Sequence, residues 1–169
     1  VMTGVFKFLM RNGTENFSAY ILAAYLPFMF LNMALMDSAQ SVLTALPVVR
    51  KVYFPREILP LASIISNIIH LLLAFVVFFL YLFAVYASTG FEESPFTYRI
   101  LFLPVLLFVY ISFTTGLSLF VSALNVFYED VKYILSVTLY LLFFLTPIMY
   151  FSETVFYSLK DQAYGKLIY

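Results

Sequence analysis

The sequence predicts an all-α fold, a polytopic transmembrane helical bundle with about four complete membrane helices and the end of a truncated one. Hydrophobic residues make up 64% of the 169 residues and charged residues only 11%, whereas an average soluble domain carries about 25% charged residues. The apolar residues also fall in long uncharged blocks, and a helix needs about 20 such residues to cross a bilayer. We therefore expect one partial transmembrane domain over residues 1–169.

Each membrane helix is expected where one uncharged block lies. The expected helices span residues 17–36, 59–87, 100–127 and 133–150. Residues 1–6 are apolar but too short to cross, so they look like the end of a truncated helix.

The segment between the first two helices, residues 37–58, holds the densest basic cluster of the chain, Arg50, Lys51 and Arg56. Such clusters favour the cytoplasmic side, although a count over all loops does not decide the orientation. Pro47 and Pro55 are expected to break any helix here. The segment is therefore expected to form a short amphipathic piece on the membrane surface or against a partner.

Composition and motifs argue against several chemistries. The net charge is zero, so nucleic acid is not an expected partner. The sequence has no phosphate-binding G-x-x-x-x-G-K-[ST] loop, so ATP is expected to bind elsewhere, and no cofactor is indicated. His70 is the one histidine in the sequence. Zinc sites and hydrolytic triads both rely on histidine, so neither kind of site is expected. A polar helix contact near Asn67 is favoured for His70, with a proton relay as the alternative.

Two motifs carry a resemblance to a known family. The first is KVYFPREILP over residues 51–60, and the second is LNVFYEDVKYI over residues 124–134, followed by FFLTPIMY over residues 143–150. They resemble ABC-2 type transporter permeases of the branch that exports polysaccharides, teichoic acids and O-antigen. Glu129 departs from the family pattern, which usually carries Arg or Lys there.

The resemblance implies that residues 37–58 form a coupling segment that docks on a separate ATP-binding cassette ATPase subunit. The candidate coupling residues are Lys51, Phe54, Pro55, Arg56, Glu57, Glu129 and Asp130. The open alternatives are positive-inside anchoring for the basic residues and a solvated turn for the acidic ones. The resemblance further implies a second copy of the chain as a partner, membrane lipids around it, a location in the cell inner (cytoplasmic) membrane, and an extracytoplasmic tail over residues 151–169.

Aromatic residues supply the candidate substrate path. The chain has 21 Phe and 14 Tyr, and a tyrosine offers both a ring face and a hydroxyl to a sugar. Permeases of the resembled family line their path with aromatic residues, and the candidates by depth in the helices are Tyr25, Tyr81, Tyr110 and Tyr140. The alternative is that these rings face lipid or pack between helices.

The resulting prediction is a membrane-spanning permease subunit, not an enzyme, that exports a lipid-linked polysaccharide or polyol-phosphate polymer. An ABC-2 exporter of drugs or lipids is the alternative. Two less favoured alternatives come from other classes of protein. An integral membrane glycosyltransferase or acyltransferase would require a polar catalytic cluster in a loop. A membrane scaffold would not depend on any ATPase.

Overall fold

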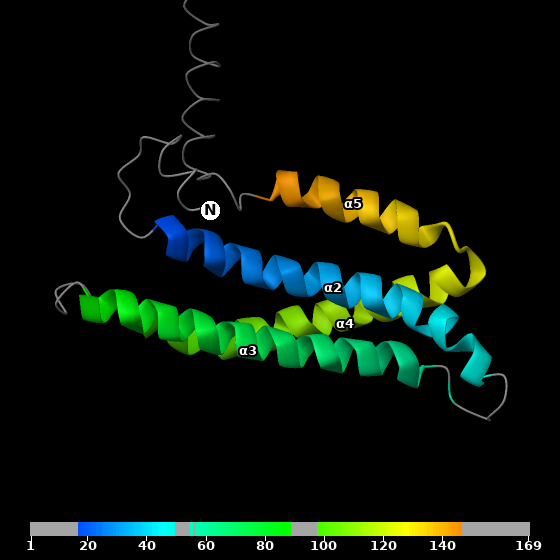
Figure 1. The fold of residues 1–169 in the computed structure, drawn as a ribbon, viewed down its shortest axis with the longest axis horizontal. Helices are drawn as coiled ribbons and strands as arrows, with labels where there is room; N and C mark the ends of the chain where they lie inside the picture. Colours follow the sequence, from blue (N-terminus) through cyan, green and yellow to red (C-terminus); the bar gives the residue numbers. More distant parts are fainter. Residues whose placement is uncertain (1–16, 50–54, 56, 89–97, 147–169) are drawn as a thin grey trace, which may run out of the picture.

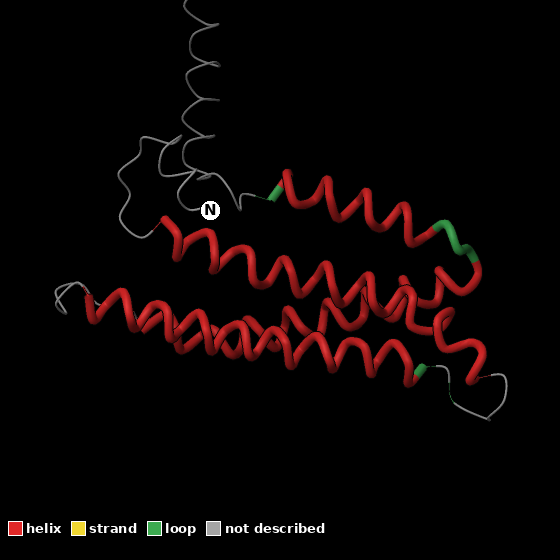
Figure 2. The backbone as a smooth tube through the Cα atoms, in the orientation of Figure 1, coloured by secondary structure: helices red, strands yellow, loops and turns green. Residues whose placement is uncertain are grey.

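The computed structural model describes residues 17–49, 55, 57–88 and 98–146. Within this part of the chain the regular structure is helical throughout, as Figures 1 and 2 show. The elements are α2 (Phe17–Val49), α3 (Ile58–Ser88), the 3-10 helix η1 (Tyr98–Phe102), α4 (Leu103–Phe127) and α5 (Val131–Leu145). By length and composition, three helices can cross a membrane, and α5 is a shorter apolar helix. The predicted all-helical, multi-pass fold is confirmed.

Helix α2 is the centre of the bundle, because it packs against α3, α4 and α5 (Figure 1). One core cluster joins Phe30 and Ala34 of α2 to Leu71 and Phe75 of α3. The second lies nearer the C-terminal end of α2 and joins residues from three helices. Its buried members are Leu35, Ala39, Val121 and Leu139.

Small and polar side chains fill the face that α4 turns toward α2. The fully or almost fully buried ones on α4 are Thr114, Ser118, Ser122 and Asn125. Their spacing of three or four residues places them on one helix face. Because small residues allow two backbones to approach closely in a membrane, the hydroxyl of Ser38 on α2 reaches the carbonyl oxygen of Ser118 at 3.4 Å.

The structure corrects the predicted end of the first helix. Helix α2 does not stop near Met36 but continues to Val49, so most of the expected loop over residues 37–58 is helical and includes Pro47. Tertiary packing explains the extension, since Ala39 and Val42 are buried. Pro47 lies in the last turn and removes only one hydrogen-bond donor there, and the final turns of α2 bend away from the rest (Figure 1).

The other expected helices overlap the observed ones. Helix α3 covers residues 58–88, and η1 with α4 covers residues 98–127. Helix α5 begins at Val131, two residues before its expected start. The expected end of that helix at residues 147–150, the expected truncated helix and the tail over residues 151–169 lie outside the described residues.

Candidate functional site: the loop end of the helix bundle

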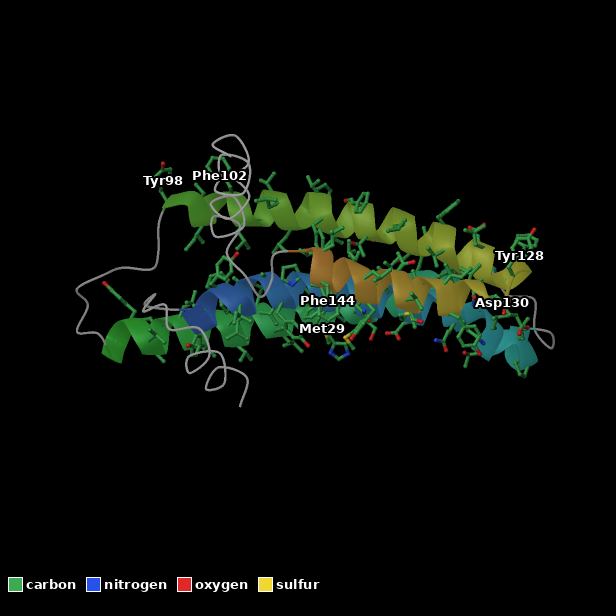
Figure 3. All side chains as sticks on the ribbon, turned by 90° about the horizontal axis from the view of Figure 1, so that it is seen from above. Met29, Tyr98, Phe102, Tyr128, Asp130 and Phe144 are labelled. Atoms are coloured by element: carbon green, nitrogen blue, oxygen red, sulfur yellow. The ribbon has the colours of Figure 1, made fainter. Side chains whose placement is uncertain are left out.

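The two segments that carry the sequence motifs lie at one end of the bundle. The C-terminal end of α2, the start of α3 and the turn from α4 to α5 are all at the right of Figure 1. Figure 3 places Tyr128 and Asp130 at this end of α4 and Tyr98 and Phe102 at the other. We call the end formed by the last turn of α2, Pro55, Glu57 and residues 128–130 the loop end.

The start of α3 presents two candidate coupling residues. Pro55 and Glu57 are both exposed. Their carbonyl oxygens accept hydrogen bonds from the first turn of α3, from Ile58 N–H at 3.2 Å and from Leu61 N–H at 3.4 Å. The carboxylate of Glu57 therefore stands at a helix N-terminus, where negative charge is stabilised. Lys51, Phe54 and Arg56 lie outside the described residues.

The turn between α4 and α5 presents the acidic candidates Glu129 and Asp130, which are both exposed. Backbone bonds close the turn, with Tyr128 N–H to Leu124 O at 2.9 Å and Val131 N–H to Tyr128 O at 3.1 Å. Asp130 occupies the N-cap position of α5, but its side chain makes no capping bond. Both carboxylates therefore remain available to a partner surface.

The buried side chain of Asn125 ties this turn to α2. Its Nδ2 donates to Ala39 O at 2.8 Å, and its Oδ1 accepts from Lys132 N–H at 3.1 Å. The residue is 0% exposed. Sequence reasoning placed Asn125 inside the second motif but gave it no role. The signal that could have found it is a lone amide near the end of an apolar helix.

A second contact that sequence reasoning missed is a side-chain hydrogen bond between α2 and α3. Asn67 Nδ2 donates to Asp37 Oδ2 at 2.9 Å and to Ser63 O at 3.0 Å. Asn67 is 4% exposed, whereas Asp37 is exposed on the surface of the described chain. The polar helix contact favoured for His70 is not seen, because His70 is exposed in the described part of the chain; Asn67, one turn earlier, makes such a contact instead.

The four candidate tyrosines lie on four different helices and have different surroundings. The Tyr110 hydroxyl donates to Pro27 O at 2.8 Å, and its ring centroid lies 5.9 Å from that of Phe30, so Tyr110 packs against α2. Tyr140 is 65% exposed. Its ring lies edge-on to Phe144, with 5.1 Å between centroids, and Phe144 is labelled in Figure 3. Tyr25 is exposed, and Tyr81 is half-buried.

The long apolar helices and the buried polar contacts between them define a multi-pass membrane protein. Within that class, the chain belongs to the ABC-2 type transporter family, whose family model matches residues 1–159. It is similar to an O-antigen export system permease protein RfbA of Klebsiella pneumoniae, 27% identical over 89% of this chain and 56% of that protein. It is also similar to an RfbA of Myxococcus xanthus, 25% identical over 89% of this chain and 55% of that protein. The chain thus spans about half the length of these relatives.

Family membership confirms three predictions. The resemblance to ABC-2 permeases was correct. The family is one of transport components, in agreement with the predicted transport role. Its location is the cytoplasmic membrane, in agreement with its candidate membrane spans.

Proposed function

We propose that this chain forms part of the membrane subunit of an ATP-driven exporter, and that the loop end is where a separate ATPase subunit docks. The proposed docking residues are Lys51, Phe54, Pro55, Arg56, Glu57, Glu129 and Asp130. ATP binding by a separate subunit is consistent with the absence of a phosphate-binding loop from this sequence.

One observation carries the proposal. The two family-like motifs are about 70 residues apart in the sequence, yet the start of α3 and the turn from α4 to α5, which belong to them, lie at the same end of the bundle (Figure 1). Exposed carboxylates from both motifs lie there, those of Glu57 and Asp130, and the basic residue Arg56 directly precedes Glu57 in the sequence. A charged surface favours a partner of complementary charge and one docking orientation.

The proposed cargo is a lipid-linked polysaccharide. The relatives that are named O-antigen export permeases support this choice over a polyol-phosphate polymer, a drug or a simple lipid. Exposed aromatic rings such as Tyr140 suit a polymer of sugar rings, because they offer stacking faces without a fixed binding pocket.

The proposed assembly contains two copies of the complete protein. In that assembly the exposed polar residues of α2, such as Asp37 and Gln40, would face a second copy or a water-filled translocation path instead of lipid. A charged side chain in contact with lipid costs about 3 kcal/mol near the bilayer centre, so a covered or hydrated position is favoured.

The test is affinity purification of the complete protein in a mild detergent, with identification of any ATPase that co-purifies. Arg56→Glu is expected to abolish the co-purification. Arg99→Glu is the matched control, because Arg99 lies in η1 at the opposite end of the bundle. Equal retention of the ATPase by both variants would overturn the docking assignment, and no ATPase with the parent protein would overturn the exporter proposal.

A further inference from the structure

Asn125 bridges three helices at the loop end through two hydrogen bonds. We infer that Asn125 is a positioning residue that makes the C-terminal part of α2, the end of α4 and the start of α5 move as one unit. A displacement of the α2–α3 connection by a partner then reaches α5. This inference rests on the proposed function, because it assumes that the partner acts at the loop end.

The bond to α2 uses a carbonyl without disrupting the helix. Ala39 O lies inside α2, and a carbonyl oxygen has a second lone pair beyond the one used by its helical partner. Ala39 is completely buried, and its methyl side chain lets α4 come close enough for Asn125 Nδ2 to reach the backbone at 2.8 Å. A larger residue at position 39 would separate the two helices.

The bond to α5 replaces a missing helix cap. Lys132 is the second residue of α5, so its N–H has no partner within the helix. The preceding Asp130 would ordinarily supply a side-chain cap, but it makes none. Asn125 Oδ1 accepts this N–H from the previous helix. The beginning of α5 is therefore held by α4, and through α4 by α2.

The position of the Asn125 hydrogen bonds along α2 allows movement of the end of that helix to be passed to α5. Ala39 lies ten residues before the end of α2 at Val49, which corresponds to about 15 Å of helix beyond the bridge. The Leu35, Ala39, Val121 and Leu139 cluster packs beside it, with residues from the same three helices. Motion of the last turns of α2 is thus transmitted to α5, the helix that carries the exposed candidate Tyr140.

A purely structural role for Asn125 makes a different prediction, and a matched pair of variants separates the two. Asn125→Leu keeps a similar side-chain volume and removes both hydrogen bonds. Val121→Ala is the control, because Val121 is buried in the cluster that includes Ala39, and its truncation costs packing at the same place while removing neither hydrogen bond of the bridge. If Asn125 only adds stability, the two variants, compared at equal thermal stability, should show the same α2–α5 distance distribution and the same export activity.

The experiment measures the distance between α2 and α5 directly. The sequence has no cysteine, so Thr44→Cys on α2 and Ser136→Cys on α5, both exposed positions, accept spin labels in a complete protein freed of any other cysteine. Labelled protein is diluted into unlabelled copies, so that each assembly reports one intramolecular distance. ATP hydrolysis and polymer export by the complete transporter are measured in parallel.

We expect one narrow distance distribution in the parent and in Val121→Ala, and a broad one in Asn125→Leu. We also expect Asn125→Leu to lower export about tenfold at unchanged ATP hydrolysis. A narrow distribution in Asn125→Leu, or equal broadening in both variants, would overturn the inference. Failure of the proposed function gives a different result. The parent protein would then show no ATP-dependent export, while the distance distributions of the variants could still be compared.

Discussion

Asp37 on α2 accepts a hydrogen bond from the side-chain amide of Asn67 on α3, with 2.9 Å between Oδ2 and Nδ2. The carboxylate lies within a helix segment that is long and apolar enough to cross a membrane. Ionisable groups in such segments are usually paired, because an unpaired one is costly to bury in a bilayer. The pair therefore fixes the register of α2 against α3 and keeps the carboxylate oriented.

Replacing Asn67 with Leu is expected to destabilise the protein by about 1–2 kcal/mol. The change leaves the Asp37 carboxylate without its amide donor while filling a similar volume. Thermal unfolding of the complete protein in detergent measures the effect. Ser66→Ala is the control at an exposed neighbouring position, and an equal loss of stability in both variants would contradict the role of the pair.

Tyr110→Phe is expected to cost about 1 kcal/mol of stability and to leave export unchanged. Its hydroxyl bonds to Pro27 O, so we interpret Tyr110 as a residue that holds α4 against α2. Tyr133→Phe, at an exposed position on α5, is the control and should change neither property. Loss of export in Tyr110→Phe at parental stability would instead make Tyr110 a substrate contact.

Tyr140→Ala is expected to reduce polysaccharide export severalfold, because the ring is largely exposed on α5 and offers a stacking face to a sugar. The loss of thermal stability is expected to stay within about 1 kcal/mol, the contribution of its ring contact with Phe144. Val137→Ala removes an exposed apolar side chain one turn away on the same helix. If both variants lose export equally, the effect belongs to the helix surface and not to the aromatic ring.

Asp130→Ala is expected to change stability by no more than about 0.5 kcal/mol, although alanine at an N-cap ordinarily costs about 1 kcal/mol. The reason is that the Asp130 side chain makes no capping bond, while Asn125 supplies one to Lys132. Thermal unfolding of Asp130→Ala beside Asn125→Leu checks this. A loss in Asp130→Ala as large as in Asn125→Leu would mean that Asp130 caps α5.

Hydropathy predicted the helices from sequence because each crossing helix needs one long uncharged block. It misplaced the end of α2, since Asp37 and Pro47 resemble the end of a membrane helix. Packing of Ala39 and Val42 continues the helix past that point, and such contacts depend on tertiary structure. The sequence shows Asn125 as a lone amide near the end of an apolar helix, but it could not identify the acceptor, because Ala39 O lies 86 residues away.

Site-specific photo-crosslinking tests the central claim most directly, because it reports which surface touches the ATPase. A photoreactive phenylalanine analogue is placed at Glu57 or Glu129 at the loop end, or at Tyr98, which is exposed at the opposite end of α4 (Figure 3). The account predicts crosslinks to the ATPase subunit from positions 57 and 129 and none from position 98. Crosslinks from position 98, or none from positions 57 and 129, would contradict it.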